Sequence, residues 1–140
     1  MITALDTNVL VALWDRDDTL NSAALTALDD AFARGSLIIS GAVFAELMAF
    51  PKRNEEFLND FLTDTEIAVD WTTNENIWRA AGRAFRAYAD RRRKQRANGP
   101  HRVLADFFMG AHAFQNGYSL LTLDDGIYRA AFPALKILRV

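Results

Sequence analysis

Short apolar runs alternate along the chain with longer segments in which apolar residues recur at helical spacing. The short runs are rich in leucine and β-branched residues and have the length of buried strands. We expect these strands at residues 2–5, 37–39, 67–69, 118–121 and 136–140. Between them, apolar residues three and four positions apart indicate helices with one buried face. The longest such segment runs from about residue 72 to about residue 96, with an expected apolar face of Ile77, Trp78, Ala81, Phe85 and Tyr88.

This alternation of strands and helices predicts an α/β fold, in which helices cover both faces of a parallel sheet. The 140 residues are enough for one core and contain no repeat or linker, so we expect a single domain over residues 1–140. No apolar run approaches the roughly 20 residues of a membrane span, and the N-terminus lacks a secretory leader pattern. We therefore expect a cytoplasmic protein with no membrane partner. The absence of cysteine excludes disulfides and thiolate chemistry.

Four acidic residues fall near the ends of the expected strands. Asp6 follows the first strand, Glu46 lies in the helix after the second, Asp106 begins the helix before the fourth, and Asp124 follows the fourth. Open α/β sheets bind their ligands at the carboxyl ends of the strands. Carboxylates gathered there would raise one another's pKa unless a cation lay between them. Because the chain has no cysteine and two histidines, this oxygen-rich set predicts Mg²⁺ or Mn²⁺.

Each of these acids also has an ordinary structural interpretation. Asp6 could cap the following helix, and Glu46 could lie on the solvated edge of its helix. Asp106 could be a first-turn acid that favours the helix dipole, and Asp124 could be a turn residue. A metal site explains their joint occurrence near strand ends better than four separate structural roles do. We expect His112, in contrast, to be a packed or surface residue rather than a metal ligand.

A cluster of basic residues stands out in a chain whose net charge is −2. The members of this cluster are Arg91, Arg92, Arg93, Lys94, Arg96 and Arg102. One interpretation is a solvated helix end, where cations favour the helix dipole. The other is an electrostatic contact surface for RNA phosphates, because any nucleic-acid affinity of such a protein must come from a local basic patch.

The motifs that carry these acids resemble those of the PIN-domain family. The matching stretches are Asp6-Thr7-Asn8-Val9-Leu10, Glu46 after the second strand, Asp106 to Ala113, and Leu120-Leu121-Thr122-Leu123-Asp124. The length and layout also resemble the VapC-type toxins of bacterial toxin–antitoxin pairs. Asp125 doubles the fourth acid, so the sequence leaves open whether Asp124 or Asp125 points inward.

The resemblance implies a fold and a chemistry. PIN domains have about five parallel strands in the order 3-2-1-4-5 and cleave single-stranded RNA with a divalent metal. By this likeness Asp6, Glu46, Asp106 and Asp124 would be the catalytic residues and hold Mg²⁺ or Mn²⁺. Asn8, Thr122 and Asp125 would support the site. The metal would lower the pKa of a bound water and clamp the scissile phosphate.

The same resemblance implies an RNA substrate, a cognate antitoxin and a homodimer. We expect the antitoxin to block the acidic pocket with a basic side chain and to lay an apolar segment along a helical groove. The alternative function is a non-catalytic module whose acids and apolar helices dock a protein partner. A receiver or phosphatase of similar topology is disfavoured, because position 8 is Asn and no lysine lies near Thr122.

Overall fold

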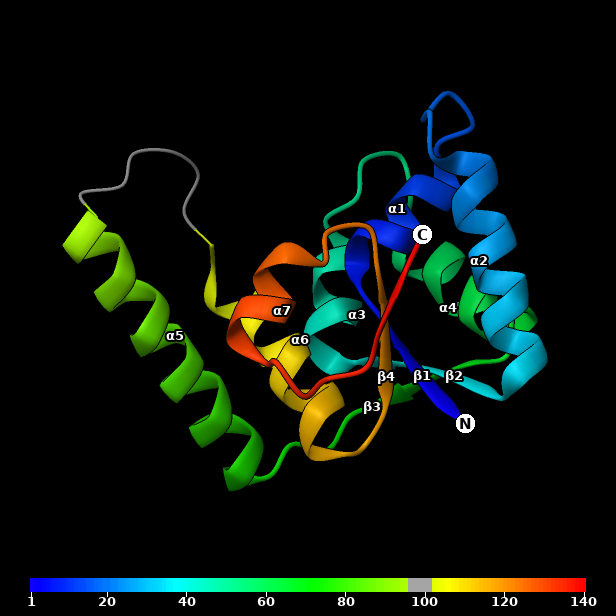
Figure 1. Ribbon diagram of the computed structural model, residues 1–140. Helices are drawn as coiled ribbons and strands as arrows, with labels where there is room; N and C mark the ends of the chain where they lie inside the picture. Colours follow the sequence, from blue (N-terminus) through cyan, green and yellow to red (C-terminus); the bar gives the residue numbers. More distant parts are fainter. Residues whose placement is uncertain (96–101) are drawn as a thin grey trace.

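The computed structural model describes residues 1–95 and 102–140 of the chain (Figure 1). Arg96, one of the residues expected to contact RNA, lies outside the described residues. The strands are β1 (Ile2–Leu5), β2 (Ser36–Ser40), β3 (Ile67–Asp70), β4 (Ser119–Thr122) and β5 (Ile137–Arg139). The helices are α1 (Thr7–Trp14), α2 (Asn21–Arg34), α3 (Gly41–Met48), α4 (Glu55–Asp64), α5 (Glu75–Gln95), α6 (Leu104–Gln115) and α7 (Gly126–Ala131).

All five strands form one parallel sheet in the order β3-β2-β1-β4-β5, as predicted. The first strand is therefore central: Ala4 pairs with Ile38 of β2 on one side and with Leu120 of β4 on the other. From β1 the chain moves outward through β2 to β3 and then crosses back to β4. The strand order reverses between β1 and β4, which is where open α/β sheets bind their ligands.

Helices lie on both sides of the sheet, with α2 and α4 on one side and α5, α6 and α7 on the other (Figure 1). The inner strands β1, β2 and β4 are largely buried from both faces, which is why they read as nearly continuous apolar runs. Their fully buried side chains include Leu5, Leu37, Ile39 and Leu120. No helix in the two described ranges is both long enough and apolar enough to cross a bilayer.

The helix α6 is the most deeply buried helix on its side, because α5 packs over it and the sheet lies beneath it. The expected apolar face of α5 is only partly covered. Ile77 and Ala81 are buried against α6, whereas Trp78 remains 51% exposed and rests on Phe108 with ring centroids 4.8 Å apart. The prediction that Trp78 belongs to the buried face was therefore wrong.

Candidate active site

Asp6 occupies the corner where β1 and β4 end side by side. Its backbone N–H donates to the carbonyl oxygen of Leu121 at 3.0 Å, so the residue extends the sheet before α1 begins. The side chain is buried, and its Oδ2 accepts hydrogen bonds from Thr122 Oγ1 and from the Tyr128 hydroxyl, each at 2.9 Å. The carboxylate thus contacts residues that lie close to the C-terminal end of the sequence. Among the described residues it makes no capping hydrogen bond to α1. The capping interpretation was wrong.

Burial raises the pKa of the Asp6 carboxyl above its ordinary value. The hydrogen bonds from Thr122 and Tyr128 oppose this shift, and the negative charge of Asp106 adds to it. The pKa of the Tyr128 hydroxyl is also raised, first by burial and then by the charges of Asp6, Asp106 and Glu46. Tyr128 therefore stays protonated and keeps donating to Asp6 at any physiological pH.

Hydrogen bonds between distant segments position the turn after β4. Thr122 Oγ1, which donates to Asp6, also accepts from the backbone N–H of Asp124 at 3.0 Å. The side-chain oxygen of Asn8 accepts from the backbone N–H of Leu123 at 3.2 Å. These contacts tie the start of α1 to the turn that carries Asp124. Asn8 and Thr122 thus both contact the turn after β4, and Thr122 also contacts Asp6.

Glu46 and Asp106 approach the same corner from α3 and α6. Glu46 is solvent-exposed, and its Oε1 accepts a hydrogen bond from Thr7 Oγ1 at 2.7 Å. Asp106 lies in the first turn of α6, where its Oδ2 accepts from the backbone N–H of Val103 at 3.3 Å. The first-turn interpretation of Asp106 is therefore correct, and it does not prevent this side chain from facing the other acids.

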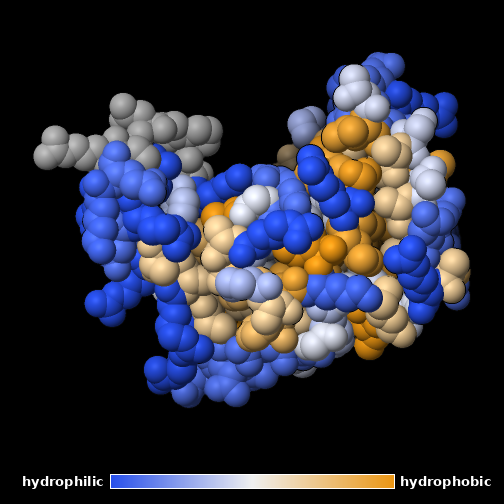
Figure 2. Space-filling model, viewed as in Figure 1, coloured by the Kyte–Doolittle hydropathy of each residue, from blue (hydrophilic) through white to orange (hydrophobic). Residues whose placement is uncertain are grey.

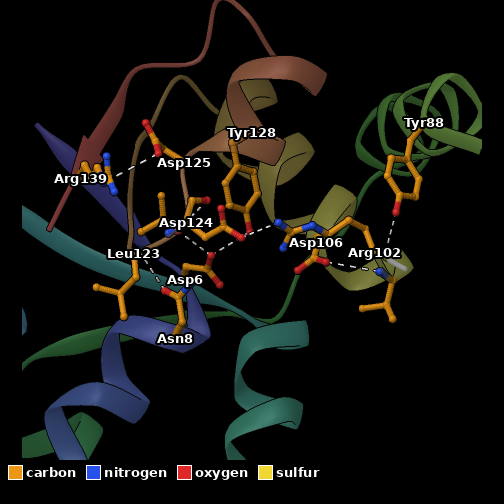
Figure 3. Close-up of polar contacts among 12 residues, drawn as sticks. Asp6, Asn8, Tyr88, Arg102, Asp106, Leu123, Asp124, Asp125, Tyr128 and Arg139 are labelled. Atoms are coloured by element: carbon orange, nitrogen blue, oxygen red, sulfur yellow. Dashed lines mark hydrogen bonds and ion pairs between the residues drawn. The ribbon is translucent and has the colours of Figure 1, made fainter. Parts of the chain in front are cut away.

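The two adjacent acids after β4, Asp124 and Asp125, have different surroundings (Figure 3). Asp124 faces Asp6 and forms an ion pair with Arg102, whose guanidinium nitrogen lies 2.6 Å from its Oδ2. Asp125 points to the other side, where it pairs with Arg129 at 2.6 Å and lies 3.8 Å from Arg139. The hydrogen bond from Arg129 lowers the pKa of Asp125. The inward residue is therefore Asp124.

All four candidate acids line one cavity of about 320 Å³, here called the acidic cavity. Its lining also includes Thr7, Asn8, Arg102, Met109 and Tyr128. Four acids from four separate segments of the sequence thus meet at the predicted edge of the sheet.

Comparison with known proteins decides the family. The sequence model of the PIN domain matches residues 3–133, which is nearly the whole chain. The chain belongs to the PIN-domain family. No curated protein sequence is significantly similar to it.

Solved structures with this PIN fold cover almost the full chain at low sequence identity. VapBC-1 from nontypeable Haemophilus influenzae shares 22% identity with a TM-score of 0.67, over 99% of this chain and 98% of that one. A toxin–antitoxin complex from Klebsiella pneumoniae shares 18% at a TM-score of 0.60, over 97% and 95%. Mycobacterium tuberculosis VapC20, a toxin that cleaves the sarcin–ricin loop, shares 17% at 0.57, over 93% and 95%. These likenesses establish the fold.

The acidic cavity of this PIN domain fits a hard divalent cation in its chemistry, because carboxylate oxygens are the ligands that Mg²⁺ and Mn²⁺ prefer. Within residues 1–95 and 102–140, no three carboxylate or imidazole groups stand close enough together to enclose an ion as they are. Asp6 is fixed by its two hydrogen bonds, whereas Glu46 and Asp124 lie toward solvent. Closing around an ion therefore requires movement mainly of these two side chains.

The basic residues lie on the neighbouring surface, where α5 ends and α6 begins. Arg92, Arg93 and Arg102 line a second cavity of about 550 Å³, the arginine groove. Its remaining lining is apolar or aromatic and consists of Phe85, Tyr88, Ala89, Val103 and Leu104. Figure 2 shows hydrophilic surface over α5 and a hydrophobic strip on the opposite side, over α1 and β5. Arg91 and Lys94 are also on the last turns of α5.

Three polar residues that line the acidic cavity were not predicted to do so: Thr7, Arg102 and Tyr128. Thr7 belongs to the Asp-Thr-Asn turn, which is a signal that was available. Tyr128 looks like an ordinary core residue of a short helix, and Arg102 was assigned only to the basic cluster. His112 is buried outside the cavity, and its Nε2 lies 2.8 Å from Asp70 Oδ2, so the expectation of a packed histidine is confirmed.

Proposed function

We propose that this PIN-domain protein is a divalent-metal-dependent endoribonuclease and the toxin of a toxin–antitoxin pair. The observation that carries the proposal is the meeting of Asp6, Glu46, Asp106 and Asp124 in one cavity at the carboxyl edge of the sheet. Such a concentration of carboxylates is unfavourable unless a cation compensates it. The likeness to VapC20, described as an RNA-loop-cleaving toxin, supports the choice of substrate.

The chain's own residues would prepare the reaction. Thr122 and Tyr128 hold the Asp6 carboxylate, and Thr7 orients Glu46 from the facing helix. Asp106 and Asp124 complete the set of oxygen donors. The chemistry that Mg²⁺ or Mn²⁺ would supply, if held by these carboxylates, is a water of lowered pKa and polarisation of the scissile phosphate. The arginine groove adjoins this cavity and offers cations and apolar surface to the flanking RNA.

A comparison of two acid-to-amide variants tests the enzyme assignment. We expect wild type to cut single-stranded RNA in Mg²⁺, and Asp6→Asn to lose at least about 100-fold of this activity. That is more than the roughly 10- to 100-fold typical for loss of an outer-shell partner. Asp125→Asn is the matched control, because Asp125 follows β4 directly after Asp124 but pairs with Arg129 and does not line the acidic cavity, and it should retain activity. Equal cutting by wild type and Asp6→Asn would contradict a role for Asp6, and no cutting by either protein would favour the non-catalytic binding module.

The antitoxin partner is part of the same proposal. A cavity of about 280 Å³ between α2, the start of β2 and the end of α4 is lined by Leu25, Leu28 and Phe32 together with Asp29, Asp64 and Glu66. Leu25 and Phe32 are each 47% exposed. This surface suits an amphipathic segment that carries basic residues. Co-purification with the protein encoded beside this gene, and its loss in Leu25→Asp, would support this docking site.

We also propose a homodimer, with Trp71 and Trp78 as the candidate contact surface. Trp71 is 66% exposed and Trp78 is 51% exposed, and large exposed apolar groups often mark interaction sites. Light scattering should give a mass of two chains for wild type and of one chain for Trp71→Lys. A monomeric wild type at high concentration would contradict the dimer.

A further inference from the structure

Arg102 is the only cationic side chain that lines the acidic cavity among the described residues. Its guanidinium reaches Asp124 at 2.6 Å, so it occupies the side of this carboxylate that faces the other acids (Figure 3). The chain thus supplies one internal positive charge to a cavity that collects four carboxylates. A divalent cation and this guanidinium would compete for the same oxygen atoms.

From this geometry we infer that Arg102 is an exchangeable counter-ion. It neutralises Asp124 when no divalent cation is bound, leaves Asp124 when one binds, and then binds a phosphate of the RNA substrate. This inference rests on the proposed metal-dependent nuclease function, which it extends by assigning a substrate-binding residue and the event that makes it available.

The ion pair between Arg102 and Asp124 has the properties of a contact that can exchange. The two side chains are 37% and 44% exposed, so water replaces the contact readily when it opens. Asp6, in contrast, is 5% exposed and held by two hydrogen bonds from neutral hydroxyl groups. A cation entering the cavity would therefore displace Arg102 more easily than it would rearrange Asp6.

The backbone of Arg102 is anchored while its side chain spans two cavities. Its N–H donates to the Tyr88 hydroxyl at 2.8 Å, which fixes the main chain against α5. The side chain lines both the acidic cavity and the arginine groove. Displacement from Asp124 therefore leaves the guanidinium beside the groove. There it would join Arg92 and Arg93 and face an incoming phosphate, to which a guanidinium can bind in bidentate fashion.

Mn²⁺ titration followed by electron paramagnetic resonance tests the competition without measuring activity. Arg102→Met should bind Mn²⁺ about two- to five-fold more tightly than wild type, as expected for removing a weak competing ion pair. Arg129→Met is the matched control, since it removes a neighbouring positive charge that pairs with Asp125. It should change the Mn²⁺ affinity much less. Equal effects of the two variants, or weaker binding by Arg102→Met, would overturn the inference.

A salt titration of RNA binding tests the second half of the inference. In the presence of Ca²⁺, to limit cleavage, Arg102→Met should bind a single-stranded oligonucleotide more weakly than wild type. The slope of log affinity against log salt should fall by about 0.7, the contribution of one phosphate contact to a single strand. Arg102→Lys should largely restore this slope. An unchanged slope in Arg102→Met would contradict a phosphate contact.

Failure of the inference and failure of the proposed function give different results. If Asp6→Asn and Asp124→Asn bind Mn²⁺ as wild type does, the metal site itself is absent and the nuclease proposal fails. If both variants weaken Mn²⁺ binding while Arg102→Met does not strengthen it, only the role of Arg102 is wrong. Arg102→Gln, a second neutral variant, repeats the measurement should Arg102→Met have an altered circular dichroism spectrum.

Discussion

The acidic cavity has a buried side and an open side, and the two are built differently. On the buried side, Asp6 is 5% exposed and receives hydrogen bonds from Thr122 and Tyr128. On the open side, the Asp124 side chain is 44% exposed and is held by one ion pair with Arg102. The buried side fixes where the site stands in the fold. The open side is free to adapt to a cation or a substrate.

The largest effect on stability is expected from filling the space behind the buried side. A Cβ at Gly110 of α6 would lie 2.4 Å from the Phe132 ring and 3.1 Å from the Tyr128 ring. We expect Gly110→Ala to lower the free energy of unfolding by about 1–3 kcal/mol, as overpacking does. It should also weaken Mn²⁺ binding, because the new methyl group crowds the Tyr128 ring, whose hydroxyl group donates to Asp6.

Gly82→Ala on α5 provides the matched control for urea denaturation. Apart from the adjacent residues and the backbone of α5 itself, no atom of the described residues lies within 4 Å of a Cβ built there. The substitution should raise the free energy of unfolding by about 0.5–1 kcal/mol, because alanine favours helix interiors over glycine. A Gly110→Ala variant as stable as Gly82→Ala would show that the packing behind Tyr128 is loose.

A second, smaller loss is expected when the buried carboxylate loses one donor. Tyr128→Phe removes the hydroxyl that donates to Asp6 at 2.9 Å and leaves the ring in place. Hydrogen bonds to charged groups contribute about 1.5–3 kcal/mol. The raised pKa of Asp6 moderates this loss, because burial already disfavours the ionised form that the hydroxyl group stabilises. We therefore expect a fall of about 1 kcal/mol at neutral pH, measured by urea denaturation in EDTA. No change would mean that water replaces the hydroxyl.

The strands and their order were predictable, whereas the partners of the acids were not. The runs at 2–5 and 118–121 are short, apolar and flanked by turns, so they mark β1 and β4 closely. The strand order came from the family resemblance. Thr122 and Tyr128, however, lie 116 and 122 residues from Asp6. Local patterns therefore left helix capping open as an alternative for Asp6, because they contain no information on such distant donors.

Two further differences have the same physical cause. Trp78 fits the apolar face of α5 by its spacing, but among the described elements only α6 and α7 contact that helix extensively, so Trp78 at the flank of the face stays half exposed. Asp124 and Asp125 are equivalent in sequence, and the choice between them depends on Arg129, one turn further along α7, and on Arg139. Periodicity shows which residues share a face, but not what covers it.

The sign of the pH dependence of stability should distinguish the buried carboxylate of Asp6 from the ion-paired carboxylate of Asp125. The pKa of Asp6 is raised in the folded protein, so its ionisation destabilises the fold. Its contribution is most favourable below the unfolded value of 3.8 and is lost as the pH rises through the folded pKa. Without divalent metal, Asp6→Asn should therefore be more stable than wild type at pH 7, and the difference should shrink as the pH falls toward 4.

Asp125 should show the opposite behaviour. Its pKa is lowered by Arg129, so its charge stabilises the fold above the unfolded value of 3.8, and this contribution is lost as the pH falls through the folded pKa. Asp125→Asn should be slightly less stable than wild type at pH 7. Urea denaturation in EDTA from pH 4 to pH 7 measures both variants. If the two differences carried the same sign, the contrast between the desolvated carboxylate of Asp6 and the ion-paired carboxylate of Asp125 would be wrong.

The smallest effect on stability is expected at the rim, where Thr7 donates to the exposed Glu46 at 2.7 Å. Thr7→Val should change the free energy of unfolding by less than about 1 kcal/mol, since water can replace an exposed hydrogen bond. It should nevertheless weaken Mn²⁺ binding measurably, because Glu46 then points toward the cavity for a smaller fraction of the time. Thr65→Val is a suitable control, because Thr65 Oγ1 donates to the carbonyl oxygen of Phe61 in α4 and Thr65 does not line the acidic cavity. Loss of stability without loss of Mn²⁺ affinity in Thr7→Val would mean that Thr7 supports packing rather than the orientation of Glu46. The open side would then be as rigid as the buried one, and the cavity could not close around an ion by movement of its exposed carboxylates.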